Sequence, residues 1–459
     1  MTNKYFSGAS RSLALVSLIL VFTSIASAQW NEQVLYSFQG GSDGNSPIGG
    51  LVFDKAGNLY GATFYGGSYE CGTVYQLSPP AQPGDPWTEA VIYTFRCKAF
   101  NDGVYPEGGL VIDAAGNLYG ETGYGGAGNC VLVGALMGCG MVYELSPPAQ
   151  KGEAWTETIL YSFPTDAKEG YVPWGDLVFD GKSNLYGATY FGGGYGTSCD
   201  PFYQYCGTVF ELSPPTQQGG TWTEAMLYGF KGISGVAAAG DGANPNGNLV
   251  LDSEGNIYGT TYSGGNHNCS YEGELGCGTA FQLKRPKQKG GAWTETVIHR
   301  FNRSNSDGGN PSAGLTINGQ GYLYGTTLNG ETGGIVFMLS PSGAPESWTE
   351  KILYGFNASE GGYAPECVLL FDATGNLFGT TTSAQFVHGT VFSLMRPQED
   401  PFWTRLQLYG FGPVPDAGNP GAGLVFDAAG NLYGTAPKGG TGTNCNGPGC
   451  GAVFEVSPP

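Results

Sequence analysis

Short apolar stretches recur along the chain, separated by turns rich in Gly, Pro, Asn and Asp. Stretches this short, with β-branched and aromatic residues and turn residues on both sides, predict strands. No stretch keeps a helical period, so the pattern predicts an all-β protein. In the first complete unit the expected strands are residues 51–54 (Leu-Val-Phe-Asp), 59–63 (Leu-Tyr-Gly-Ala-Thr), 72–77 (Gly-Thr-Val-Tyr-Gln-Leu) and 87–95 (Trp-Thr-Glu-Ala-Val-Ile-Tyr-Thr-Phe).

This four-strand unit repeats seven times. Its marker is a Gly-Asn-Leu-Tyr-Gly turn, in which one unit has Tyr322 in place of the Asn. Self-similarity at a regular spacing is typical of repeat folds, and strands that are apolar on both faces suit small sheets packed between neighbours. We therefore expect a seven-bladed β-propeller with four strands per blade. The Asn of the marker stands at Asn58, Asn117, Asn184, Asn256, Asn376 and Asn431.

The two ends of the repeat region complement one another. Residues 30–38 form an outer strand that belongs to no preceding unit, and residues 451–456 form a third strand with no outer strand after it. An open solenoid would need polar caps at both ends, which this chain lacks. We therefore expect the N-terminal strand to join the last blade and close a ring.

The first 28 residues read as a secretory signal peptide. Lys4 and Arg11 precede an apolar stretch at 13–22, and Ala26-Ser27-Ala28 is a small-x-small cleavage pattern. The remaining residues, 29–459, are expected to form one propeller domain. No later stretch approaches the ~20 apolar residues of a membrane helix. The protein is thus expected outside the cell, or in the periplasm or cell envelope.

Eleven cysteines in an exported chain predict disulfides. In four local pairs the second Cys directly precedes a Gly at the start of a third strand. Cys71 has the same position, and Cys97 in the next loop on the same face is its expected partner; Cys367 is left over. Zinc ligation is disfavoured because Cys-x-x-Cys spacing is absent. The four local pairs are Cys130/Cys139, Cys199/Cys206, Cys269/Cys277 and Cys445/Cys450.

Charge excludes one class of partner and suggests one candidate site. With 38 acidic and 19 basic residues, a net charge of −19 repels nucleic acid. A repeated Asp-Gly-x-x-Pro phrase is expected to surround one mouth of the central channel, where its carboxylates could bind Ca²⁺ or a cationic ligand. The simpler interpretation is that the phrase builds identical turns. Its acidic residues are Asp43, Asp102, Asp241, Asp307 and, more loosely, Asp166, Glu360 and Asp416.

Signals for catalysis are weak. The three histidines, His267, His299 and His388, have no metal-ligand spacing, and no Gly-x-Ser-x-Gly elbow is present. Paired carboxylates from distant blades could still cleave a glycoside. Trp174 is the one Trp outside the outer-strand series, and its position in a channel-side loop makes it a candidate for ligand contact.

The repeat phrase also resembles a known family. Asp-Ala-Ala-Gly-Asn-Leu-Tyr-Gly, followed by Gly-Thr-Val-Phe-Glu-Leu-Ser-Pro, resembles the GloVer tandem repeat of exported bacterial proteins over essentially the whole mature chain, and is loosely similar to NHL-type blades. The resemblance implies a propeller and carries over no catalytic residue.

The expected function is therefore a secreted, non-catalytic binding scaffold, most simply a monomer, for a polysaccharide, protein or envelope component, without a required cofactor. The alternative is a Ca²⁺-dependent hydrolase or lyase with its site at the channel mouth. Convergent polar groups on one or two blades would favour the enzyme.

Overall fold

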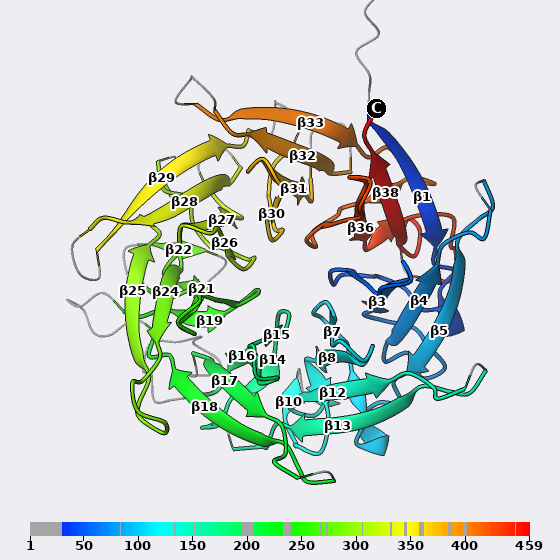
Figure 1. Ribbon diagram of the computed structural model, residues 1–459, viewed down its shortest axis with the longest axis horizontal. Coiled ribbons are helices and arrows are strands. Elements are labelled where there is room, and N and C mark those ends of the chain that lie inside the picture. The colour runs from blue at the N-terminus through cyan, green and yellow to red at the C-terminus, as the bar shows by residue number, and fades with distance from the viewer. Residues whose placement is uncertain are drawn as a thin grey trace, which may run out of the picture.

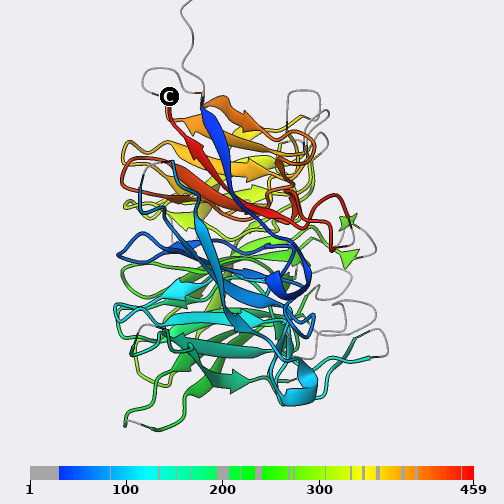
Figure 2. The ribbon, with the colours of Figure 1, turned by 90° about the vertical axis from the view of Figure 1, so that its right-hand side faces the viewer.

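Seven antiparallel sheets surround a central axis in the computed structural model (Figure 1). The chain is a seven-bladed β-propeller, as the repeats predict, and the two loop faces lie at opposite edges of the ring (Figure 2). The predicted signal peptide lies outside the described residues. The structure describes residues 30–459 except 83, 133–134, 151, 167, 194–205, 218, 233–239, 267–268, 272–273, 305, 331–332, 344–346, 358–361, 384–387, 398–401 and 446.

The four strands of a blade run from the channel outwards as inner, second, third and outer strand. The inner strands of blades 1 to 7 are β2 (Val52–Phe53), β7 (Val111–Ile112), β15 (Val178–Phe179), β20 (Val250–Leu251), β26 (Thr316–Ile317), β30 (Leu370–Phe371) and β35 (Val425–Phe426). The second strands are β3 (Leu59–Thr63), β8 (Leu118–Thr122), β16 (Leu185–Phe191), β21 (Ile257–Ser263), β27 (Leu323–Thr327), β31 (Leu377–Thr381) and β36 (Leu432–Ala436).

Third and outer strands complete each sheet. The third strands are β4 (Thr73–Ser78), β12 (Met141–Ser146), β17 (Thr208–Ser213), β24 (Thr279–Lys284), β28 (Ile335–Pro341), β32 (Thr390–Met395) and β38 (Ala452–Ser457). The outer strands are β5 (Thr88–Thr94), β13 (Thr156–Ser162), β18 (Thr223–Gly229), β25 (Thr294–Arg300), β29 (Trp348–Gly355), β33 (Thr404–Gly410) and, in blade 7, β1 (Asn31–Ser37).

The remaining elements are short and lie in the loops. They are β6 (Gly103–Val104), β9 (Tyr124–Gly125), β10 (Val131–Leu132), β11 (Ala135–Leu136), β14 (Tyr171–Pro173), β19 (Ala243–Pro245), β22 (Ser270–Tyr271), β23 (Glu274–Leu275), β34 (Ala417–Gly418), β37 (Lys438–Gly439) and the 3₁₀ turns η1 (Gly41–Asp43) and η2 (Lys98–Phe100). No helix in the described part of the chain is long and apolar enough to span a membrane.

The N-terminal strand closes the ring, as expected. β1 pairs antiparallel with β38, from Asn31 opposite Ser457 to Ser37 opposite Ala452, and it lies beside the red C-terminal strand in Figure 1. The same sheet therefore contains strands from both ends of the chain.

The Asp of each marker turn caps its own hairpin. In blade 1, Asp54 Oδ1 accepts hydrogen bonds from the backbone N–H groups of Ala56 and Asn58, and its Oδ2 accepts them from the Asn58 amide and the Tyr60 hydroxyl. The carboxylate thus replaces the backbone partners that the turn lacks, which is the structural role typical of Asx turns.

A backbone hydrogen bond joins each blade to the next on the cysteine-loop face. Its donor is a residue of positive φ that stands directly before a Pro, and its acceptor is the carbonyl that precedes the first Gly of the preceding blade's third strand. The last bond of the series closes the circle from blade 7 to blade 1. The pairs are Tyr105–Cys71, Val172–Cys139, Asn244–Cys206, Asn310–Cys277, Ala364–Gly333, Asn419–His388 and Ser46–Cys450.

An aromatic pair fills the core at every blade interface. The Phe after each outer strand meets an aromatic ring on the third strand of the next blade, with centroids 4.9–5.3 Å apart and mostly edge-to-face. The pair between blades 7 and 1 uses Phe38, which is fully buried against Tyr75.

Four of the predicted disulfides join loops on one face. They are Cys71–Cys97, Cys130–Cys139, Cys269–Cys277 and Cys445–Cys450. Cys199 lies outside the described residues, and its expected partner Cys206 is buried. Cys367 is a free, buried thiol whose Sγ donates to the Thr380 carbonyl, and burial raises its pKa to about 11.

The closure of the ring predicts a stability difference between two phenylalanines. Phe38→Ala removes a fully buried ring at the blade 7–blade 1 interface and should cost about 3–5 kcal/mol of unfolding free energy. Phe402→Ala removes a ring that is 76% exposed and should change it by less than about 0.5 kcal/mol. Urea denaturation of both variants measures the difference. Equal midpoints would contradict the closed ring.

Candidate functional site

The aspartates of the Asp-Gly-x-x-Pro phrase do not surround the channel, so that part of the sequence-based expectation is wrong. Five of the carboxylates accept a hydrogen bond from the aromatic side chain of their own outer strand, because the loop folds back onto that strand. In blade 2 the Tyr161 hydroxyl donates to Glu169 instead of Asp166, and Glu360 lies outside the described residues. Tyr36 donates to Asp43 at 2.8 Å, and Tyr93 donates to Asp102 at 3.0 Å. The equivalent contacts are Tyr228–Asp241, His299–Asp307 and Tyr409–Asp416.

A glutamate of the next blade lies beside each of these aspartates. It is the Glu of the Trp-Thr-Glu phrase, or its equivalent, and one of its carboxyl oxygens is buried without a hydrogen-bond partner among the described protein atoms. Burial, followed by repulsion from a neighbouring acidic group, raises its pKa to about 8 in Glu32 and to about 7 in Glu89, Glu224 and Glu295. These carboxyl groups therefore hold protons near neutral pH.

The central channel is lined by the segment before each inner strand, Pro-x-x-x-Leu. This segment brings one turn from every blade to the axis, where they enclose a cavity of about 240 Å³. Blades 1, 5 and 7 contribute mostly Gly and Ala, whereas blades 2, 3, 4 and 6 contribute larger side chains. The larger polar and aromatic ones are Glu107, Trp174, Asp176, Asn246, Asn248 and Glu366.

Three carboxyl groups lie together on the blade 2–blade 3 side of this channel. Burial raises the pKa of Glu107, Glu121 and Asp176, and repulsion from the other two adds to the effect at Glu121. Asp176 is held in place by the Gly109 N–H and by the Asn248 amide, 2.5 Å away. A raised pKa means that the carboxyl holds its proton more tightly, and a protonated carboxyl can donate a hydrogen bond as well as accept one.

Glu121 departs from the repeat at a position with a structural role elsewhere. In four blades the equivalent residue is a Thr whose hydroxyl donates to a carbonyl of the next blade's channel segment. Glu121 is 2% exposed, and neither of its carboxyl oxygens has a partner among the described protein atoms. Its carboxyl group therefore lacks the structural role of the Thr. Those threonines are Thr260, Thr326, Thr380 and Thr435.

Aromatic side chains concentrate over blades 1, 2 and 3 on the cysteine-loop face. We call this set the aromatic arc. Phe64 stacks on Tyr105 with centroids 4.7 Å apart, and Trp174 lies 5.6 Å from Tyr190. In blades 4 to 7, the two residues after the Leu-Tyr-Gly-x-Thr motif or its variants include only one aromatic, Tyr262. The aromatic arc is Phe64, Tyr65, Tyr105, Tyr124, Tyr171, Trp174, Tyr190 and Phe191.

Tyr105 occupies a backbone position that does not suit it. Its φ is 59°, a region that bulky residues rarely adopt, and the equivalent residue is Asn in blades 4, 5 and 7. Those asparagines also donate a side-chain hydrogen bond to the preceding blade. The positive φ itself belongs to the blade-to-blade hydrogen bond, since Val172 has it at the same position in blade 3. Tyr105 differs from those asparagines in that its ring stacks on Phe64.

A second cavity of about 660 Å³ lies beside Tyr105. It is lined by Tyr65, Tyr105, Glu70 and Lys438, and Tyr65 is 43% exposed. Pro437 lines both this cavity and the channel, so the two are neighbours on one face. The aromatic arc, this cavity and the channel carboxyls together form the candidate site.

Sequence reasoning found one member of this site and missed the others. Trp174 lines the channel cavity, as its expected channel-side position requires. Glu107, Glu121 and Asp176 were not singled out. Glu121 and Asp176 each interrupt a position that is small or hydroxylated in most other repeats, so comparing the repeats with one another would have found these two; the position of Glu107 varies throughout and gives no such signal.

Sequence comparison identifies the repeat itself. Residues 20–269 and 268–459 match the Gloeobacter/Verrucomicrobia repeat. No curated protein matches the chain.

Solved structures share the ring. Two structures of a polysaccharide lyase, an ulvan lyase, align with TM-scores of 0.54, at 11% and 12% identity, over 93% of this chain and 96% of theirs. One of them is bound to a GlcA(1-4)Rha3S saccharide. A Dyadobacter fermentans protein of unknown function aligns at 10% identity with a TM-score of 0.41, over 93% and 99% of the two chains. At 11% and 12% identity, the likeness to the two lyase structures concerns the fold alone.

Tyr105→Asn is expected to leave the protein as stable as the wild type or more so. The variant places at this position the residue that blades 4, 5 and 7 have, and Asn tolerates positive φ better than Tyr. Thermal unfolding measures the effect. A fall in Tm of several degrees would mean that Tyr105 is a structural residue.

Acidic groups with raised pKa values predict that stability falls as pH rises. The interface glutamates bind protons more tightly in the folded than in the unfolded chain, so their favourable contribution is complete below about pH 4.5 and is lost as pH rises to about 8. We expect a lower Tm at pH ~8 than at pH ~5. Glu89→Gln should reduce this difference, whereas exposed Glu254→Gln should not. A Tm that rises over this range would contradict the assignment.

Proposed function

The chain is a member of the Gloeobacter/Verrucomicrobia repeat family, and from this premise we propose that it is an exported, non-catalytic protein that binds a neutral polysaccharide. Four disulfides support a location outside the reducing cytoplasm. The proposal rests on one observation: the aromatic arc gathers on three of seven otherwise similar blades.

Aromatic rings suit the apolar faces of sugar rings, and neighbouring carboxyl, amide and hydroxyl groups suit sugar hydroxyls. The aromatic arc supplies the rings, with Tyr65 and Tyr105 at the 660 Å³ cavity and Trp174 at the channel. Lys438 and Glu70 supply polar groups at the 660 Å³ cavity, and Asp176 supplies one at the channel. Ligand pockets combine an apolar lining with a few polar groups at fixed positions. This arrangement therefore suits a saccharide ligand better than it suits the flat surface of a protein partner.

The net charge of the chain and the volumes of the two cavities limit which ligands are expected. A net charge of −19 disfavours polyanions, so a neutral chain is preferred over an acidic one. The channel cavity of about 240 Å³ is below the usual ~300–1,000 Å³ of small-molecule sites. It therefore suits a single ring or a chain end, while the larger cavity beside Tyr105 suits the next units.

Alanine substitutions in the aromatic arc test the proposal. We expect Trp174→Ala and Tyr65→Ala each to weaken binding of a neutral oligosaccharide found in a glycan screen by about 10-fold, or about 1.4 kcal/mol. Tyr322→Asn is the matched control: it changes an aromatic residue of a marker turn to the residue of the other repeats and should leave affinity unchanged. Calorimetry with the folded variants gives the affinities. If the arc variants bind as the wild type does, the ligand lies elsewhere.

A hydrolase or lyase is the second candidate, and the carboxyl cluster of the channel favours it. A buried carboxyl with a raised pKa, such as that of Glu107, is suited to donate a proton to a leaving oxygen. Glu107→Gln would then abolish release of reducing ends from a bound polysaccharide while leaving binding intact, and a chelator would test the Ca²⁺-dependent form. If the wild type binds the polysaccharide but does not cleave it, the enzyme is ruled out and binding is the function.

A further inference from the structure

A second set of side chains, far from the channel, recurs between the outer strands of adjacent blades. Between blades 2 and 3 it consists of Tyr93, Asp102 and Glu157, and the Tyr93 hydroxyl lies 3.0 Å from Asp102 and 2.7 Å from Glu157. The phenol thus bridges a loop carboxyl of its own blade and a strand carboxyl of the next. This contact explains why Tyr, Asp and Glu recur together in most repeats of this chain, and it needs no ligand.

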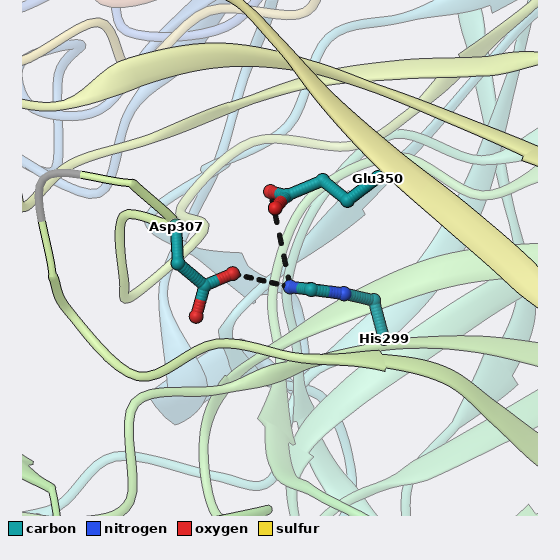
Figure 3. A group of neighbouring side chains, drawn as sticks. All are labelled: His299, Asp307 and Glu350. Carbon is teal, nitrogen blue, oxygen red and sulfur yellow. Dashed lines mark hydrogen bonds and ion pairs between the residues drawn. The ribbon is translucent and has the colours of Figure 1, made fainter.

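Blade 4 has an imidazole where the other blades have a phenol. His299 Nε2 lies 2.5 Å from Asp307 Oδ1 and 3.8 Å from Glu350 Oε1, and the three groups point toward one another (Figure 3). All three ligand atoms lie within 4.8 Å of each other. Among the described residues this is the one group of His, Cys, Asp or Glu side chains that meets this spacing.

The donor set is one that a transition metal prefers. One imidazole nitrogen and two carboxylate oxygens are ligands of zinc, whereas Ca²⁺ requires six to eight oxygens. A tetrahedral ion with bonds of about 2.0 Å keeps its ligand atoms about 3.3 Å apart, and the two distances from His299 Nε2 lie on either side of this value. Small side-chain rotations would therefore equalise them.

The surroundings hold these ligands in position. The Asn302 N–H donates to Asp307 Oδ2 at 2.7 Å, which leaves Oδ1 directed at the imidazole. Glu350 Oε1 is buried and has no hydrogen-bond partner among the described atoms. The side chains are 20% (His299), 7% (Asp307) and 13% (Glu350) exposed, so the group is sheltered but open to an ion from solvent.

We propose that His299, Asp307 and Glu350 bind one zinc ion, with water as the fourth ligand, and that this ion joins blade 4 to blade 5. His299 and Asp307 belong to blade 4 and its following loop, and Glu350 belongs to β29 of blade 5. The ion offsets the charge of the two carboxylates, whereas between blades 2 and 3 a neutral phenol hydroxyl lies between the two carboxyl groups. This site is independent of the saccharide proposal, since it lies at the outer strands and not at the channel.

Zinc titration of the full chain without an affinity tag tests the site. Calorimetry with ZnCl₂ should give one ion per chain for the wild type, and CoCl₂ should give the visible spectrum of a tetrahedral Co²⁺ centre. His299→Tyr restores the residue of the other blades, so it should fold normally and lose at least about 100-fold in affinity. Glu350→Gln should weaken binding, and Zn²⁺ should raise the Tm of the wild type but not of His299→Tyr.

Two controls separate this site from other histidines and from the fold. His388→Asn should bind zinc as the wild type does. Tyr228→His provides blade 3 with the same three groups, because the Tyr228 hydroxyl lies 2.6 Å from Asp241 and next to Glu295, and it should add a second ion. A wild type that binds no zinc, or zinc binding that survives both His299→Tyr and Glu350→Gln, would overturn the proposal.

Discussion

The blade-to-blade backbone hydrogen bond on the cysteine-loop face is the contact on which the rest of the structure depends. Its donor requires positive φ, and its acceptor carbonyl precedes a Gly that packs against the Pro of the next blade, as Gly72 does against Pro106. A Cβ on Gly72 would lie 2.5 Å from the Pro106 ring, so Gly is required there. Because the same bond joins Ser46 to Cys450, the ring closes with the geometry of every other interface.

This regular framework separates residues that build the ring from residues that are free to differ. The framework uses the same Asp, Gly, Pro and Phe in nearly every blade. By contrast, the first and third of the three residues between this Pro and Leu differ from blade to blade, whereas the middle residue is Gly in blades 1 to 4, where a Cβ on Gly49 or Gly108 would overlap a carbonyl oxygen of the next blade. Glu107, Trp174 and Asp176 stand at the two variable positions, and Tyr105 takes a positive φ. The coincidence of these departures on adjacent blades makes a shared ligand the simplest explanation.

Much of the fold could be predicted from the sequence because the repeat displays the same local rule seven times. The second strand at 59–63, the pairing of 30–38 with 451–456 and the Cys71–Cys97 disulfide all follow from repeat position. The location of Asp43 could not be predicted, because it depends on the loop folding back to the Tyr36 hydroxyl. Comparing the repeats singles out Glu121 as a departure, but its neighbours in space, Glu107 and Asp176, could not be predicted because they come from separate segments.

The interfaces between outer strands show how an acidic chain reduces the repulsion between its own carboxyl groups. Most blades place a phenol between two carboxyl groups and keep a proton there, while blade 4 has an imidazole. The closed ring brings these groups together, since each set contains residues of two blades.

Amide hydrogen exchange at Ser46 tests the closure of the ring most directly. The account predicts exchange as slow as at Tyr105 and Asn310, which make the same bond elsewhere in the ring. Rapid exchange at Ser46 alone would show that blades 7 and 1 are not joined.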